Sequence, residues 1–220
     1  MPGAKPCAHK LMALTTDQDV HPESLQEKYA EAQRYFMGQG RVNNTLAQLA
    51  RDLKAYEIDY VVFGAVALFA HGYPRFTEDI DLIMTEAGLK RFQDELVGLG
   101  YVPSFVGARK RFRSTLDGVP IEIMLTGEYP GDGLPKPVSI PEPAAVATEI
   151  DGIRFVTIEK LIELKLASGI SASDRLKDLA DVQELIKIRA LPREFAERLN
   201  PYVRAKYLEL VESVEKLGSD

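Results

Sequence analysis

The chain has 220 residues, 45% of them hydrophobic, which is typical of a globular protein with one or two domains and a sizeable core. Its formal net charge of −6 argues against a protein that coats nucleic acid with its whole surface, although a local basic patch could still bind RNA or DNA. Cys7 is the only cysteine, which excludes a disulfide framework and a cysteine zinc cluster. No apolar run is long enough for a signal peptide or a membrane span, so we expect a cytoplasmic protein with no membrane partner.

The N-terminal half alternates between helical and extended patterns. Residues 1–20 contain two prolines and only scattered apolar side chains, and we expect them to form a flexible tail. Helical periodicity runs from Pro22 to about Met37, and a second helix is predicted over Asn44–Tyr56. The elements predicted next are a strand over Asp59–Phe63, a helix over Ala65–Ala70, a strand over Asp79–Met84 and a helix over Glu86–Leu99 that Gly100 closes.

The second half begins with a predicted hairpin over residues 109–125. Residues 128–143 contain five prolines, too many for regular structure, and we expect a linker or flap there. A short hairpin over Ala147–Val156, turning at Asp151-Gly152, precedes a helical remainder. This order predicts an α/β (α+β) fold in which a small mixed sheet is flanked by helices. The predicted catalytic domain spans residues 21–156 and includes the N-terminal helices. A helical region follows over residues 157–220.

Two aspartates one residue apart are the first candidate site. Side chains alternate along a strand, so Asp79 and Asp81 project from one face while Ile80 and Leu82 face the other way. Two carboxylates held so close repel each other unless a cation lies between them. Hard oxygen ligands suit Mg²⁺ or Mn²⁺, although an isolated Asp-X-Asp also occurs at an exposed strand edge or turn.

A third carboxylate comes from the predicted hairpin. Asp117-Gly118 is typical of a two-residue turn, and that turn places Arg113 opposite Glu122, with Glu122 facing away from the core. Two aspartates on one strand and one acidic residue on a neighbouring strand can hold two cations about 3.5–4 Å apart for phosphoryl chemistry. A lone glutamate on a two-faced strand is otherwise simply solvated.

Gly64 and Lys165 are candidate anion contacts. Gly64 lies where a predicted strand meets a helix N-terminus, a place where backbone N–H groups bind anions, although a tight turn alone also favours glycine. Lys165 continues the apolar stripe of its helix, so its ammonium either reaches the surface or points at an anion.

These residues together resemble the minimal nucleotidyltransferases of the DNA polymerase beta superfamily, in which a strand, Gly-Gly or Gly-Ser and a helix precede Asp-X-Asp and a later Asp or Glu. The chain is most similar to the AbiEii-type group, bacterial abortive-infection toxins and their relatives. Residues 75–81, Arg-Phe-Thr-Glu-Asp-Ile-Asp, match its Arg-X-Thr-X-Asp-hydrophobic-Asp motif. A downstream helical motif is matched by Lys165, Arg175, Asp178 and Asp181, and the resemblance covers about Tyr60 to Ile188.

The resemblance implies a nucleotidyltransferase fold and an enzyme that uses two Mg²⁺ or Mn²⁺ ions to move a nucleoside monophosphate from an NTP such as ATP to a hydroxyl. The implied catalytic residues are Asp79, Asp81, Glu122 and Lys165, of which the three carboxylates hold the metals. The implied nucleotide-binding residues are Gly64, Ala65, Arg75, Thr77, Lys165, Asp178 and Asp181. The implied acceptor is tRNA or a protein, in a toxin–antitoxin setting with an antitoxin partner.

Several of these roles have structural alternatives. Ala65 replaces the second Gly or Ser of the family pattern, which removes a hydroxyl contact to phosphate but keeps a backbone N–H. Asp178 and Asp181 could form ordinary surface pairs with Arg175 and Lys177. Arg75 and Thr77 could support the loop rather than touch phosphate.

The acceptor and the activity also have alternatives. Arg111 and Arg113 share the face of Glu122 in the predicted hairpin and could contact a phosphate-rich acceptor, or they could simply discourage edge pairing of the strand. A small-molecule acceptor, such as an aminoglycoside, would instead predict an acidic pocket. A non-catalytic nucleotide-binding module and a glycosyltransferase with its own Asp-X-Asp are the alternatives from other functional classes.

Overall fold

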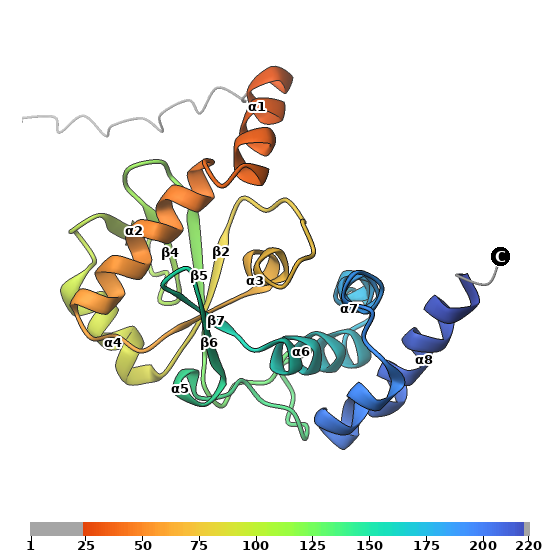
Figure 1. Cartoon of the computed structure of the whole chain (residues 1–220). Coiled ribbons are helices and arrows are strands. Elements are labelled where there is room, and N and C mark those ends of the chain that lie inside the picture. The colour runs from red at the N-terminus through yellow and green to blue at the C-terminus, as the bar shows by residue number, and fades with distance from the viewer. Residues whose placement is uncertain (1–23, 218–220) are drawn as a thin grey trace, which may run out of the picture.

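The structure is a computed structural model that describes residues 24–217, so the predicted tail lies outside the described residues. Two helices come first, α1 (Leu25–Phe36) and α2 (Arg41–Ala55) (Figure 1). α1 begins within the predicted segment because Ser24 and Glu27 form a capping box, in which each side chain accepts a hydrogen bond from the other residue's backbone N–H. α2 begins at Arg41 rather than at the predicted Asn44.

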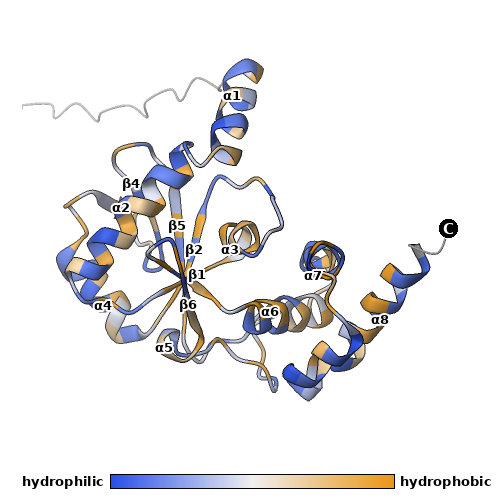
Figure 2. Ribbon diagram, viewed as in Figure 1, coloured by the Kyte–Doolittle hydropathy of each residue, from blue (hydrophilic) through white to orange (hydrophobic). Residues whose placement is uncertain are grey.

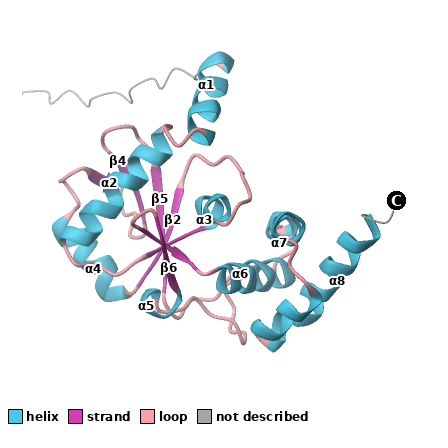
Figure 3. Cartoon of the chain, in the orientation of Figure 1, coloured by secondary structure: helices cyan, strands magenta, loops and turns pink. Residues whose placement is uncertain are grey.

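Seven strands form one mixed sheet in the order β3-β4-β5-β2-β1-β7-β6. Figure 3 shows the strands at the centre of the molecule with helices on both sides. The strands are β1 (Val61–Phe63), β2 (Ile80–Met84), β3 (Tyr101–Pro103), β4 (Arg111–Ser114), β5 (Pro120–Leu125), β6 (Ala147–Ile150) and β7 (Ile153–Val156). β2 pairs in parallel with β5 and antiparallel with β1, while β1 pairs in parallel with β7. The predicted α/β class with a mixed sheet flanked by helices is therefore confirmed.

The register of β2 against β5 sets the geometry of the carboxylates. Asp81 of β2 lies directly opposite Glu122 of β5 in the parallel pairing. Neighbouring strands lie about 4.8 Å apart and opposed residues share a face, so these two side chains leave the sheet side by side. Ile80 and Leu82 are fully buried, as predicted for the opposite face of β2.

The predicted register of the β4–β5 hairpin is wrong by two residues. Arg111, not Arg113, lies opposite Glu122, and Arg113 lies opposite Pro120. A shift of two residues keeps every side chain on its predicted face, because the side-chain period of a strand is two. Arg111 and Arg113 therefore still share the face of Glu122, but their order along it differs from the prediction.

The register differs because the loop is longer than a two-residue turn. Ser114 donates its backbone N–H to the Val119 carbonyl, which leaves four residues in the loop. A type I′ turn needs positive φ at both central residues, and here Gly118 has φ +73° while Asp117 does not take a positive φ. The Asp117 carboxylate instead accepts hydrogen bonds from Thr45 Oγ1 of α2 at 2.6 Å and from the Val119 N–H.

One further helix is shorter than predicted. α4 (Glu86–Glu95) ends four residues before Leu99, which is exposed. The chain leaves the helix because Val97 pairs with Tyr101 and the Gly98 N–H donates to the Tyr101 carbonyl, a path that Gly98 allows with φ +90°. Gly100 therefore does not close this helix.

The remaining helices are α3 (Gly64–Ala70), α5 (Pro143–Val146), α6 (Ile158–Ser171), α7 (Leu176–Arg189) and α8 (Pro201–Leu217), with a 3₁₀ helix, η1, over Arg193–Arg198. α6, α7 and α8 lie together on one side of the sheet, opposite α2 and α4 (Figure 1). Residues 128–142 form an irregular flap, as predicted. The β6–β7 hairpin also turns as predicted, with positive φ at both Asp151 and Gly152.

The hydrophobic residues of the strands form the centre of the molecule, and the hydrophilic faces of the helices point outward (Figure 2). The core contains the largest fully buried side chains, among them Tyr35, Phe92, Phe112 and Tyr207. None of the helices between residues 24 and 217 has the length and apolar character that crossing a membrane requires.

Candidate active site

A cavity of about 410 Å³ brings together nearly all of the predicted site residues. Its walls come from the start of α3, the loop before β2, the strands β2 and β5, the flap, and the facing ends of α6 and α7. The predicted residues that line it are Gly64, Ala65, Arg75, Thr77, Asp79, Asp81, Glu122, Lys165 and Asp178. Asp181, Arg111 and Arg113 are not among the lining residues.

Gly64 is required at the start of α3 for two separate reasons. Its φ is +66°, a conformation that other residues rarely adopt. A Cβ at this position would also overlap the carboxylate of Asp81. The absent side chain therefore lets the Asp81 carboxylate lie against the backbone at the junction of β1 and α3.

Burial and neighbouring charges raise the pKa of Asp81 to about 7, from an ordinary value near 3.8. Removal of the carboxylate from water is the largest cause, and repulsion by Asp79 and Glu122 adds to it. Lys165 and Arg75 oppose the shift without cancelling it. The protein surroundings therefore stabilise the charged form of Asp81 less well than water does.

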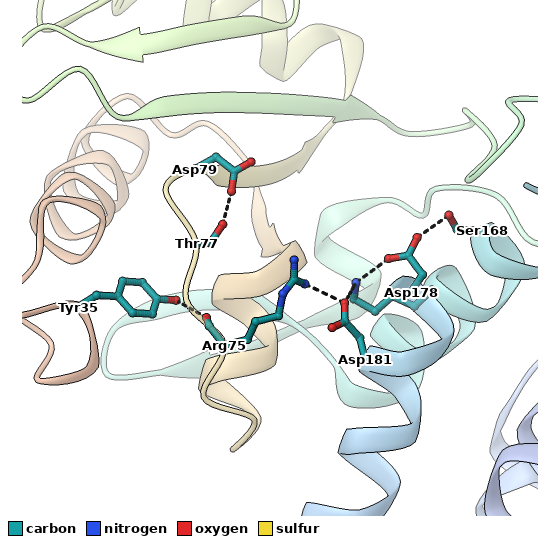
Figure 4. Close-up of polar contacts among 8 residues, drawn as sticks. Tyr35, Arg75, Thr77, Asp79, Ser168, Asp178 and Asp181 are labelled. Carbon is teal, nitrogen blue, oxygen red and sulfur yellow. Dashed lines mark hydrogen bonds and ion pairs between the residues drawn. The ribbon is translucent and has the colours of Figure 1, made fainter. Parts of the chain in front are cut away.

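The other two carboxylates each accept hydrogen bonds from a neighbouring side chain. Thr77 Oγ1 donates to Asp79 Oδ1 (Figure 4). Arg111 donates to Glu122 Oε1. Among residues 24–217, no three carboxylate, histidine or cysteine side chains are arranged as a ready ligand set for a metal ion.

The chemistry of the donor set nevertheless fits a divalent cation. Asp79, Asp81 and Glu122 supply only carboxylate oxygens, the donors that Mg²⁺ and Mn²⁺ prefer. Burial is the main cause of the raised pKa of Asp81, and repulsion by Asp79 and Glu122 adds to it; a cation would offset both. These three residues would hold such ions.

Lys165 is buried, with 4% of its side chain exposed, so it does not extend to the surface. Its Nζ donates to Asp178 Oδ1 and to Asp181 Oδ2, each at 2.8 Å. Ser168 Oγ also donates to Asp178, at 2.7 Å. The anions that Lys165 reaches are thus two carboxylates of α7.

Asp178 is ionised because of these contacts. Burial alone would raise its pKa, but the Lys165 ammonium and the hydrogen bonds from Lys165 and Ser168 hold the pKa below its ordinary value. Asp178 and Asp181 do not form the surface pairs that their spacing from Arg175 and Lys177 allows, since Asp178 is half-buried and Asp181 is buried.

Arg75 connects the loop before β2 to α7. Its Nη1 donates to Asp181 Oδ2 at 2.8 Å, and its backbone carbonyl accepts a hydrogen bond from the Tyr35 hydroxyl at 3.2 Å (Figure 4). The side chain is 19% exposed and lines the cavity. Arg75 therefore has both a structural partner and access to a ligand, so neither of its predicted roles excludes the other.

The cavity also contains cations that the site prediction omitted. Arg175 and Lys177 line it where α7 begins; neither side chain forms a hydrogen bond or a salt bridge within residues 24–217, although the charge of Arg175 helps to lower the pKa of Asp178. Arg175 belongs to the motif that carries the resemblance, but Lys177 looked like a surface residue. Only the packing of α7 against α6 shows that both line the cavity that holds the carboxylates.

Comparisons with known proteins identify no family. No protein-family model and no curated protein matches the chain. The solved structure of JHP933 from Helicobacter pylori is similar over 80% of this chain and 90% of its own, with 18% identity and a TM-score of 0.43. Two further structures are each described as a "putative nucleotidyltransferase" and are 18% identical to this chain. The one from Helicobacter pylori is similar over 79% of this chain and 95% of its own, with a TM-score of 0.39. The one from Thermotoga maritima is similar over 78% of this chain and 96% of its own, with a TM-score of 0.37. Likenesses this distant carry no functional argument, so the function must be inferred from the cavity.

Proposed function

We propose that the protein is a metal-dependent nucleotidyltransferase that moves a nucleoside monophosphate from an NTP to a hydroxyl acceptor. The observation that carries the proposal is the composition of one cavity, whose lining combines three carboxylates at β2 and β5 with four cationic side chains and two further carboxylates, Asp174 and Asp178. The cations are Arg75, Lys165, Arg175 and Lys177. Carboxylates that can hold divalent metal ions, in the same cavity as arginine and lysine side chains that can bind phosphate, suit a nucleoside triphosphate.

In the proposed reaction the acceptor oxygen forms a bond to the α-phosphorus, and the bond from that phosphorus to the bridging oxygen breaks, which releases pyrophosphate. The acceptor proton leaves toward Glu122 or solvent. Bound divalent cations would stabilise charge on the leaving pyrophosphate and lower the pKa of the acceptor hydroxyl. Positioning and electrostatics supply the rest of the rate enhancement.

The residues of the cavity divide this work by their location. Asp79, Asp81 and Glu122 would hold the cations, and Thr77 keeps the Asp79 carboxylate in one orientation. Arg175 and Lys177, at the start of α7, would bind the outer phosphates. The glycine at the start of α3 leaves the space that the Asp81 carboxylate occupies, so this proposed metal ligand lies against the backbone.

For the acceptor, the exposed arginines of β4 favour a phosphate-bearing molecule such as tRNA over a protein. Arg113 is exposed and its side chain forms no hydrogen bond or ion pair within the described residues, so its charge is available to a partner. Arg111 lies next to it on the same face, opposite Glu122. A role as a toxin with an antitoxin partner belongs to the same proposal and rests on the resemblance alone.

A second cavity favours a small cationic acceptor as the other candidate. It has a volume of about 260 Å³, shares Thr77 with the first cavity, and has Glu31, Glu78 and Asp117 in its walls together with Arg41. Glu31 and Asp117, however, already accept hydrogen bonds from the protein, including the Arg41 N–H and Thr45. Only Glu78 remains without such a partner among the described residues, so the acidic character of this cavity is smaller than its composition indicates.

The test is transfer of label from each α-labelled NTP, with Mg²⁺, into total RNA and total protein from a bacterial lysate. We expect label in the RNA, absent with Asp79→Asn and retained with Glu95→Gln, a control that removes an exposed carboxylate of α4. Label in protein would change the acceptor class, and label only in added aminoglycosides would favour the second cavity.

The non-catalytic and glycosyltransferase alternatives give different results in the same experiment. NTP binding by calorimetry without transfer to any acceptor would favour a binding module. Turnover of a nucleotide sugar in place of an NTP would favour a glycosyltransferase. Either result would overturn the proposed reaction.

A further inference from the structure

We infer that Asp181 is a positioning residue that orients Arg75 and Lys165 toward the nucleotide without touching it; the inference rests on the proposed function. Asp181 is 2% exposed and is not among the residues that line the cavity, whereas both of its partners line it. The sequence motif alone placed Asp181 among the nucleotide contacts. Its location behind the cavity wall gives it a different role.

A single oxygen of Asp181 holds both cations. Arg75 Nη1 and Lys165 Nζ each donate to Oδ2 at 2.8 Å. Arg75 comes from the loop before β2, Lys165 from α6 and Asp181 from α7. The carboxylate therefore fixes the relative positions of two cationic groups that belong to separate segments of the chain.

Each of the two cationic side chains has more N–H donors than its carboxylate partners accept, and the remaining donors are available to a ligand. The Lys165 ammonium has three donors, of which Asp181 and Asp178 accept two, so one is left. Arg75 has five donors, and a single N–H is directed to Asp181. Because Asp181 holds one end of each group, the free donors keep a fixed direction at the cavity wall.

The charges predict an unusual effect of neutralising Asp181. Arg75 and Lys165 are balanced by Asp178 and Asp181, so the four groups together have no net charge. Loss of the Asp181 charge makes the wall more positive, which favours binding of a polyanion. The same change releases the two cations from their fixed geometry, which slows a reaction that depends on their position.

The experiment compares wild type with Asp181→Asn in two measurements, the NTP dissociation constant by calorimetry and kcat for transfer. We expect kcat to fall about 10- to 100-fold, as for misplaced catalytic groups, while the dissociation constant stays the same or decreases. A parallel loss of kcat and NTP affinity would mean that Asp181 contacts the nucleotide, and an unchanged kcat would mean that it does not position the cations. Either result would overturn the inference.

Glu163→Gln is the matched control. Glu163 is another buried carboxylate of the helical region, 5% exposed, and it pairs with Lys160 and accepts the Asn200 N–H outside the cavity. Its substitution should lower the melting temperature. It should leave the kcat and the NTP affinity of the folded protein unchanged. The same pattern for Asp181→Asn would assign Asp181 a structural role only.

The double variant Arg75→Gln/Asp181→Asn keeps the inference testable if the single variant does not fold. It removes one cation and one anion together, so no buried charge is left without a partner. We expect the double variant to have a lower kcat than Arg75→Gln alone, because Lys165 has lost the carboxylate that positions it. We expect no loss of NTP affinity relative to Arg75→Gln. Weaker NTP binding by the double variant than by Arg75→Gln would contradict the inference.

Discussion

Arg111 donates two hydrogen bonds to the same oxygen of Glu122, from Nε at 3.2 Å and from Nη2 at 3.0 Å. The carboxylate that receives them is one of the three in the proposed metal site. A divalent cation at Glu122 therefore has to compete with the guanidinium. The pair is well exposed, with 60% and 46% of the two side chains accessible, so this competition is modest.

Arg111→Gln should therefore strengthen metal binding. Since an exposed ion pair contributes at most about 1 kcal/mol, we expect the Mn²⁺ concentration for half-maximal binding to decrease by up to about fivefold. Calorimetric titration with Mn²⁺ measures the change. Arg113→Gln removes a neighbouring arginine that lies opposite Pro120 and should leave Mn²⁺ affinity unaltered. Equal effects of the two variants would argue against direct competition at Glu122.

The raised pKa of Asp81 predicts how stability depends on pH without divalent cations. The folded protein keeps the Asp81 proton up to about pH 7, whereas the unfolded chain releases it near pH 3.8. The folded state thus binds more protons in this interval, so Asp81 should lower the free energy of unfolding as the pH rises from about 4 to 7. Relative to wild type, Asp81→Asn should become more stable over that range by a few kcal/mol, on the order of 1.4 kcal/mol per pKa unit. Urea unfolding in EDTA at pH 5, 6, 7 and 8 measures this, and parallel curves for the two proteins would contradict it.

Metal binding should show the opposite dependence on pH. A cation requires the ionised form of Asp81, so bound metal displaces a proton. The rise in melting temperature produced by Mn²⁺ should therefore grow between pH 6 and pH 8. Asp81→Asn should show little rise at any of these values. A Mn²⁺ effect on wild type that is independent of pH would place the cation away from Asp81.

Gly64→Ala should remove metal binding and destabilise the protein. The new methyl group would overlap the Asp81 carboxylate, and alanine at φ +66° adds backbone strain of about 1–2 kcal/mol. Gly133→Ala is the control, because Gly133 has φ +73° but open space around the position of a Cβ. Both variants should lose stability from strain, while only Gly64→Ala should lose Mn²⁺ binding by calorimetry.

Gly131→Ala should detach the flap from α6. A Cβ at this residue would lie 2.7 Å from the Ser168 carbonyl oxygen and would overlap the Ser171 hydroxyl. Gly131 has φ +75°, so Gly133→Ala again reproduces the strain without the overlap. We expect faster hydrogen exchange of the flap amides in Gly131→Ala than in Gly133→Ala, together with weaker NTP binding because Gly131 lines the cavity. Identical exchange in the two variants would show that close packing on α6 does not hold the flap.

Local sequence patterns predicted the strands and helices that form the cavity, because alternation and helical periodicity depend on neighbouring residues. The two Asp-Gly pairs show the limit of this reasoning. Asp151-Gly152 forms the expected two-residue turn, whereas Asp117 hydrogen-bonds to Thr45 and the loop widens. Thr45 is 72 residues away in the chain, so nothing near Asp117 indicates this contact.

The partners of Lys165 were also beyond the reach of local patterns. The apolar stripe of α6 indicated that Lys165 faces the interior or an anion, but the anions lie on α7 and depend on how the two helices pack. Arg175 and Lys177 were less visible still, because charged residues at a helix start are common on protein surfaces. Their place in the cavity lining depends on how α7 packs against α6.

The walls of the cavity come from two consecutive stretches of the chain, which has a practical consequence. All three carboxylates precede Thr157, while Lys165, Arg175 and Lys177 follow it. A gene split at Thr157 would encode one fragment with the carboxylates and another with most of the cations. The proposed nucleotide transfer would then require both fragments in the same tube, so the two fragments could serve as a split reporter of their own reassembly.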